Sequence, residues 1–72
     1  MRIDNATEPL FVALVKGTER YILIYSPERT EEAIRVLGRY AADPLLSFTW
    51  FDASLLAQRI RAGVGGEPNV NL

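Results

Sequence analysis

The chain has 72 residues, a formal net charge of −1 and a pI near 5.3, and it contains neither cysteine nor histidine. This composition excludes disulfides and thiolate zinc sites, and it removes the commonest general base and metal ligand. The small net charge gives no global attraction to nucleic acid or to anionic membranes. Because a domain this small buries only about 60–65% of its unfolded surface, self-association is the stabilising device that remains.

The N-terminal residues 1–8 are polar and unpatterned, and Pro9 precedes the first apolar run. That run, Leu10–Val15, is far shorter than the ~20 residues that cross a bilayer. The first residues carry an acid and lack the basic, apolar and small-residue regions of a signal peptide. We therefore expect a flexible segment at residues 1–8 and a cytoplasmic protein.

Two runs of β-branched, aromatic and aliphatic residues on either side of Gly17-Thr18 predict an antiparallel hairpin over residues 10–25. A two-residue loop with glycine first suits a type II′ turn, which places Lys16 opposite Glu19. The register then assigns one face to Leu10, Val12, Leu14, Tyr21, Leu23 and Tyr25. It assigns the other face to Phe11, Ala13, Val15, Ile22 and Ile24.

Both faces of this hairpin are apolar, whereas a sheet with one wet face alternates apolar and polar residues. Contiguous exposed apolar patches on monomers rarely exceed a few hundred Å², so we expect the uncovered face to contact another chain. Tyrosine suits a partly wet interface, so the tyrosine-bearing face is expected to be outermost. The alternative is that the N-terminal segment or the second helix covers it within one chain.

The first helix is predicted to begin at Ser26-Pro27-Glu28, with serine at the N-cap, proline at N1 and an acid in the first turn. It should end near Ala42, because Asp43 precedes a proline. One side carries Thr30, Ala33, Ile34, Leu37, Tyr40 and Ala41, and the opposite side carries Glu28, Glu31, Glu32, Arg35 and Arg39. Gly38 in the middle costs about 1 kcal/mol relative to alanine.

The segment Ser47–Phe51 is aromatic-rich and partly alternating, which predicts a short third strand. We then expect Asp52 to be the N-cap of a second helix that ends near Ala62, with Phe51 and Leu56 forming a hydrophobic staple. The buried stripe of this helix comprises Ala53, Leu56, Ala57 and Ile60. Residues 63–72, rich in glycine, proline and asparagine, predict a flexible tail.

The expected architecture is a two-layer α+β fold in the order β-β-α-β-α, with a single domain at residues 9–62. A right-handed crossover makes the third strand parallel to its neighbour, and both helices cover one face of the sheet. If residues 47–51 are an irregular connection instead, the fold reduces to a hairpin and two helices. One sheet face stays open in either case.

Two groups of residues are candidates for contact with nucleic acid. Anion or nucleic-acid contact is the functional interpretation of Arg35, Arg39, Arg59 and Arg61. A structural role is favoured, because Glu31 and Glu32 are spaced to pair with Arg35 and arginine near a helix C-terminus suits the helix dipole. The second group, Phe48, Trp50 and Phe51, is interpreted as core rather than as a base-stacking platform, since acidic residues flank it.

Catalytic patterns are missing from the sequence. The serines have no histidine to activate them, and the glycine-rich residues 63–66 lack the Gly-Lys-Ser/Thr of a phosphate loop. We expect no enzymatic activity, no cofactor and no metal site. The sequence favours a homodimeric protein–protein interaction module. One alternative is a nucleic-acid-binding regulator whose arginines are gathered by dimerisation, and another is an accessory subunit covered by a larger partner protein.

Overall fold

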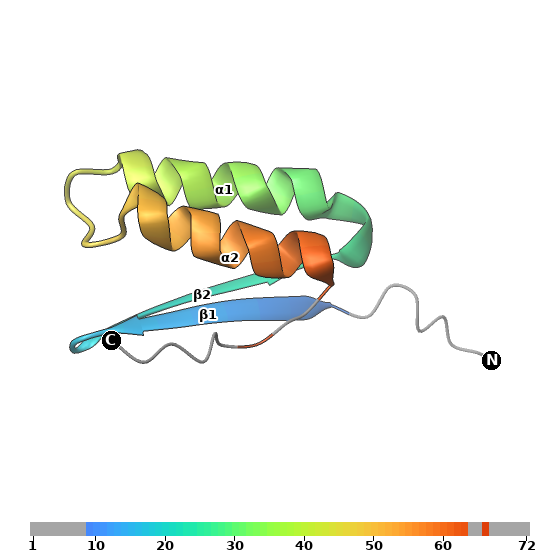
Figure 1. The fold of residues 1–72 in the computed structure, drawn as a ribbon, viewed down its shortest axis with the longest axis horizontal. Coiled ribbons are helices and arrows are strands. Elements are labelled where there is room, and N and C mark those ends of the chain that lie inside the picture. Colours follow the sequence, from blue (N-terminus) through green and yellow to red (C-terminus); the bar gives the residue numbers. More distant parts are fainter. Residues whose placement is uncertain (1–8, 64–65, 67–72) are drawn as a thin grey trace.

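The computed structural model describes residues 9–63 and Gly66. Two strands form one layer and two helices form a second layer on one face of the sheet (Figure 1). In chain order the elements are β1 (Leu10–Lys16), β2 (Glu19–Tyr25), the 3-10 turn η2 (Pro27–Arg29), α1 (Thr30–Ala42) and α2 (Trp50–Ala62). The α+β class is therefore confirmed for this part of the chain, in the order β-β-α-α.

The hairpin has the predicted register, from Lys16 opposite Glu19 to Leu10 opposite Tyr25. Gly17 at the turn has a φ of +59°, and no other residue type in the described part of the chain has a positive φ. This backbone is the one that a type II′ turn requires. Since successive strand residues point to opposite faces, the turn decides which side chains share a face.

The helices cover the tyrosine-bearing face of the sheet, so the prediction that this face is outermost is wrong. Val12, Leu14 and Tyr25 are buried in the core, while Tyr21 and Leu23 are half-buried against it. The core also contains three alanines of the helices: Ala33, Ala53 and Ala57. Small residues on the helices leave space in the core for larger side chains, and close packing favours that match.

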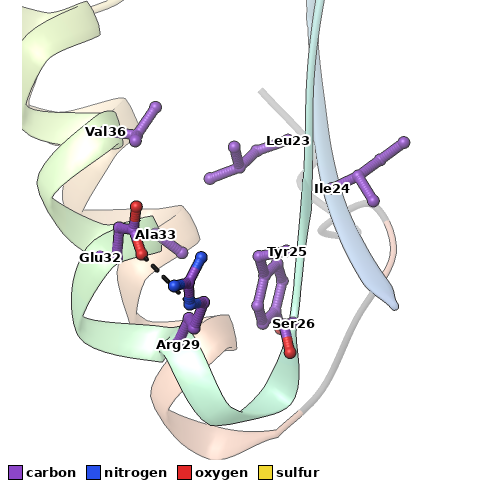
Figure 2. A pocket seen from close by; sticks show the side chains of 8 residues that line it. All are labelled: Leu23, Ile24, Tyr25, Ser26, Arg29, Glu32, Ala33 and Val36. Carbon is purple, nitrogen blue, oxygen red and sulfur yellow. Dashed lines mark ion pairs between the residues drawn. The ribbon is translucent and has the colours of Figure 1, made fainter. Parts of the chain in front are cut away.

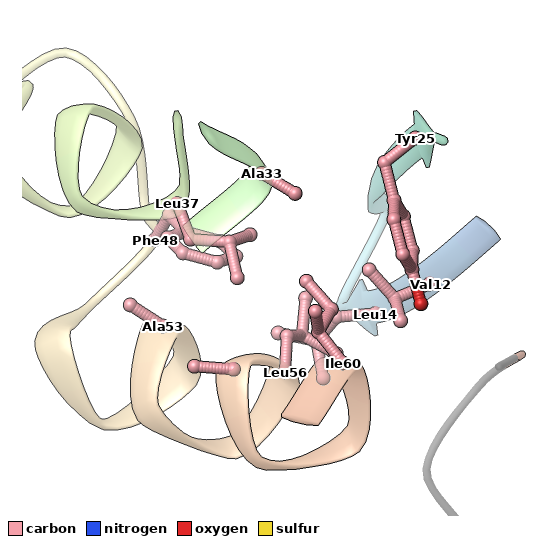
Figure 3. Close-up of a cluster of buried hydrophobic side chains, with 10 residues drawn as sticks. Val12, Leu14, Tyr25, Ala33, Leu37, Phe48, Ala53, Leu56 and Ile60 are labelled. Atoms are coloured by element: carbon pink, nitrogen blue, oxygen red, sulfur yellow. The ribbon is translucent and has the colours of Figure 1, made fainter. Parts of the chain in front are cut away.

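The core lies between the two layers and draws on every strand and helix. Its largest fully buried side chains are Val12, Leu37 and Leu56, from β1, α1 and α2 (Figure 3). The predicted buried stripe of the second helix is confirmed, since all four of its residues are buried: Ala53, Leu56, Ala57 and Ile60. The amphipathic pattern of the first helix is confirmed too, with Ala33 and Leu37 buried and the acidic and basic residues exposed.

The predicted third strand at Ser47–Phe51 is wrong. Residues 47–49 are irregular, and Trp50 and Phe51 form the first turn of α2. Phe48 accounts for the difference, because its buried ring packs edge-on between Tyr21 and Tyr40, with ring centroids 5.1 and 5.8 Å away. The short connection 43–49 makes α1 and α2 antiparallel neighbours rather than parts of a crossover (Figure 1).

The N-cap of α2 is Thr49 and not Asp52. The Thr49 hydroxyl accepts from the Asp52 N–H at 3.1 Å, and Asp52 Oδ2 accepts from the Thr49 N–H at 2.9 Å, which is a capping box. The predicted staple between Phe51 and Leu56 is wrong as well, because Phe51 is exposed. Phe48 and Ala53 occupy the two staple positions and are both in the core.

The first helix begins later than predicted. Ser26 makes no side-chain cap, and its hydroxyl donates to the Glu28 carboxylate instead. Pro27–Arg29 forms a 3-10 turn, and the α-helix starts at Thr30. The predicted end near Ala42 is confirmed, where Asp43 takes an extended conformation before proline.

Gly38 lies in α1 under the ring of Trp50, and a Cβ there would be 3.8 Å from Trp50 Cζ3, an ordinary contact. Gly38→Ala is therefore expected to raise the free energy of unfolding by about 1 kcal/mol, because alanine loses less backbone entropy in a helix. A urea titration followed by circular dichroism measures this change. The control is Gly63→Ala, which should destabilise because Gly63 has a φ of +73°. A loss of stability in Gly38→Ala would contradict the inference that Trp50 leaves room for the added methyl group.

Candidate interaction surface

The sheet face turned away from the helices is apolar and exposed. It carries four large side chains that we call the open face: Phe11, Val15, Ile22 and Ile24, which are 49%, 43%, 51% and 68% exposed. Two come from β1 and two from β2, and the two-residue period of the strands places them together. Of the predicted interface set, Leu10 alone remains exposed, at 36%. The surface available to a partner is thus the alternative face of the same hairpin.

The outer edge of β1 is partly occupied by Gly66. The Gly66 N–H donates to the Phe11 carbonyl at 2.7 Å, and the Ala13 N–H donates to the Gly66 carbonyl at 3.1 Å. These bonds form a parallel bridge beside Val12, and Ala13 is buried. The predicted flexible tail otherwise lies outside the described residues after Gly63, as does the predicted flexible segment 1–8.

The outer edge of β2 has no partner strand among the described residues. The sheet has the order β1-β2, and its isolated bridge lies on β1. In this register Arg20, Ile22 and Ile24 each form a non-hydrogen-bonded pair with the opposite residue of β1. Their backbone N–H and C=O groups therefore point away from β1. This edge is therefore a row of backbone donors and acceptors beside the open face.

A hollow of about 220 Å³ lies between β2 and α1. Figure 2 shows Leu23 pointing across it toward α1, while Ile24 points to the opposite side of the strand. An ion pair closes one side, with Arg29 Nε 3.6 Å from Glu32 Oε1. The hollow is smaller than the ~300–1,000 Å³ typical of small-molecule sites.

A second group of exposed apolar side chains lies at the connection between the helices: Leu45, Trp50 and Phe51. The prediction that Trp50 and Phe51 belong to the core is wrong, and it is confirmed for Phe48. Leu45 is 90% exposed and projects from the loop. This group belongs to the helix layer, whereas the open face is on the other side of the sheet (Figure 1).

The four arginines proposed for anion contact are not gathered in one place. Arg39 lies in the last turn of α1, whereas Arg59 and Arg61 lie in the last turn of α2. Because the helices are antiparallel, these turns are at opposite ends of the helix layer (Figure 1). The expected pairing of Glu32 with Arg35 is replaced by the ion pair of Glu32 with Arg29. A single copy therefore presents no compact basic patch from these four residues.

Lys16 and Asp52 form a polar contact that was not predicted from the sequence. Lys16 Nζ donates to Asp52 Oδ2 at 2.8 Å and to the Ser47 carbonyl at 2.7 Å, which ties the hairpin end to the start of α2. Burial alone would raise the pKa of Asp52, but hydrogen bonds from Lys16 and from the Thr49 backbone outweigh it and hold the pKa below its usual value. The pattern Thr-x-x-Asp at residues 49–52 was the available signal for this arrangement.

Tyr21 extends the same polar contact. Its hydroxyl accepts from the Ser47 N–H at 3.1 Å and donates to the Glu19 carboxylate. The hydrogen bond to Glu19 raises the pKa of the Tyr21 phenol. Every polar group here has a partner of matching chemistry, which is typical of a structural contact rather than of a reactive centre.

Within the part of the chain that the structure describes, no three histidine, cysteine, aspartate or glutamate side chains come together as a metal site needs. Among the same residues, no helix has the length and apolar character to cross a membrane. Comparisons of the chain with protein-family models, curated proteins and solved structures give no match. A function must therefore be inferred from the surface geometry.

Proposed function

We propose that the chain is a small, non-catalytic protein–protein interaction module of the cytoplasm, and that it forms a homodimer through the exposed side of its hairpin. The open face supports this proposal most directly. Phe11, Val15, Ile22 and Ile24 are large, adjacent and each at least 43% exposed. Monomeric proteins rarely leave a contiguous apolar patch of this kind in water.

The energy gained from burying the open face is similar in size to the cost of association, so dimerisation should depend on concentration. Full burial of one such side chain contributes about 1.5–3 kcal/mol, and roughly half of that remains to be gained from the open face. Complete burial of the open faces of two copies, eight side chains, would set an upper bound of roughly 6–12 kcal/mol on this gain. The loss of translational and rotational freedom costs about 4–15 kcal/mol. Since the net charge of each copy is only −1, long-range repulsion between copies is small.

Ile24→Asp is expected to convert the dimer to a monomer, because Ile24 is the most exposed residue of the open face at 68% and a carboxylate there resists burial. The measurement is light scattering behind size exclusion over a hundredfold range of concentration, with a dimer at twice 8.1 kDa. Circular dichroism checks that the variant stays folded.

Leu45→Asp is the matched control, because Leu45 is 90% exposed but lies in the connection between the helices and not on the open face. The control should keep the wild-type mass. A wild-type monomer at every concentration would refute homodimerisation. A dimer that Ile24→Asp leaves intact would place the contact on another surface.

A further inference from the structure

We infer that two copies pair edge to edge through β2, in antiparallel orientation about a two-fold axis, so that two hairpins become one four-stranded sheet. This inference rests on the proposed self-association and specifies its contact. The occupant of the edge is a second copy of the chain. Strand addition of this kind uses backbone hydrogen bonds for affinity and side chains for register.

The backbone of β2 is suited to pairing with itself. Ile22 is the midpoint of Glu19–Tyr25, and the outward-facing residues Arg20 and Ile24 lie symmetrically on either side of it. With Ile22 opposite Ile22 of the other copy, Arg20 lies opposite Ile24 at both ends. Every outward N–H and C=O group of these three residues then gains a partner.

The opposite edge of the sheet is less suited to such pairing. On the outer edge of β1, the Phe11 carbonyl and the Ala13 N–H are already hydrogen-bonded to Gly66. Charged side chains, which can protect a strand edge, occupy only the first two positions of β2, Glu19 and Arg20, and the strand has no proline and no bulge in its register. Among the described residues, the outer edge of β2 is therefore open to a second copy from Arg20 to Ile24.

The side chains at this edge are complementary to their own two-fold copies. On the open face, the two Ile22 side chains become neighbours, and Ile24 packs on the aliphatic part of Arg20. On the helix side, Tyr21 of one copy lies opposite Leu23 of the other copy, beside the hollow that Leu23 lines between β2 and α1. The most exposed apolar residue of the strand, Ile24, is thereby partly covered, while Phe11 and Val15 of β1 stay on the outer face of the four-stranded sheet.

The charges at the two ends of β2 are also complementary. Glu19 begins the strand and Arg29 follows its end, on the wall of the hollow. Antiparallel pairing places Glu19 of one copy opposite Tyr25 of the other, beside Arg29. Within one copy the two residues are separated by the length of the strand, so this attraction arises only between copies.

Single-cysteine variants test the pairing directly, because the natural chain has no cysteine. In a hydrogen-bonded antiparallel pair the opposed Cα atoms are about 5.5 Å apart, which is within the range of a disulfide. Ile22→Cys should therefore form a disulfide-linked dimer at least tenfold faster than Val15→Cys under mild oxidation. Val15 is a matched control, since it is 43% exposed on the same face but lies on β1. Non-reducing electrophoresis against time measures both rates.

The outcomes separate this inference from the proposed function. Equal rates for the two variants would mean that whole faces stack, which overturns edge pairing and keeps the homodimer. Slow linkage of both variants in a chain whose wild-type mass is that of a dimer would also overturn edge pairing alone. Slow linkage in a wild-type monomer would refute both, and would assign the edge to another segment or to a different protein.

A charge exchange provides an independent test that leaves β2 free of cysteine. Glu19→Arg and Arg29→Glu should each weaken dimerisation at least threefold through like-charge contact, and the double variant should restore it toward the wild-type value. Sedimentation equilibrium at low salt measures the three dissociation constants. A double variant that is weaker than both single variants would contradict the pairing.

Discussion

Leu37→Ala is expected to lower the free energy of unfolding by about 3–4 kcal/mol, since buried Leu→Ala changes cost about 2–5 kcal/mol. Leu37 is 1% exposed and belongs to the core between the helices and the sheet (Figure 3). Stability of roughly 0.05–0.15 kcal/mol per residue gives a chain of this length a small margin. We expect a substantial unfolded fraction in the variant at room temperature.

Urea unfolding followed by circular dichroism and Trp50 fluorescence measures this effect at one fixed protein concentration, because association shifts apparent stability. Leu45→Ala removes the same atoms from a side chain that is 90% exposed, and it should change stability by less than about 0.5 kcal/mol. A cost below about 1 kcal/mol for Leu37→Ala would contradict the close packing of the core.

The features that were predictable from sequence depend on neighbours along the chain. The hairpin register follows from Gly17-Thr18, because a two-residue turn determines which residues of the two strands are opposite each other. The buried stripe of α2 follows from the 3.6-residue period of its apolar positions. In both cases a local rule determines the answer, and the structure confirms it.

The choice of sheet face was not predictable in this way. Both faces of the hairpin are apolar, so the alternation that normally distinguishes inside from outside is absent. The choice depends on packing between distant segments, which places Val12 and Tyr25 of the sheet in one core with helix residues such as Leu37. Such packing leaves no periodic trace in the sequence. The tyrosine-bearing face was therefore predicted to be exposed, although the helices cover it.

The error at residues 47–51 has a different origin. Aromatic residues favour strands, but Phe48 is buried between tyrosine rings from β2 and α1, a tertiary contact that overrides local preference. The Thr-x-x-Asp pattern at residues 49–52 does signal a helix start. Interpreting Asp52 as the cap moved the predicted start by three residues and left Lys16 without its true partner.

Asp52→Ala is expected to lower the free energy of unfolding by about 2–3 kcal/mol, because it removes both a capping interaction and the partner of a part-buried cation. Lys16 Nζ lies 2.8 Å from Asp52 Oδ2, and that oxygen also accepts from the Thr49 N–H at 2.9 Å. Asp52→Asn is the matched variant, since it keeps a side-chain acceptor for Thr49 and removes the charge. It should cost less than Asp52→Ala.

The pH dependence of stability tests the contribution of the Asp52 charge. The pKa of Asp52 is lower in the folded chain than its usual value of about 3.9. The carboxylate therefore contributes its stabilisation fully above the usual pKa, and the contribution is lost as the pH falls through the lowered folded value. In urea titrations from pH 6 to pH 2, the difference in stability between wild type and Asp52→Asn should shrink as the pH falls. A difference that is constant over this range would show that the charge of Asp52 does not stabilise the link between the hairpin and α2.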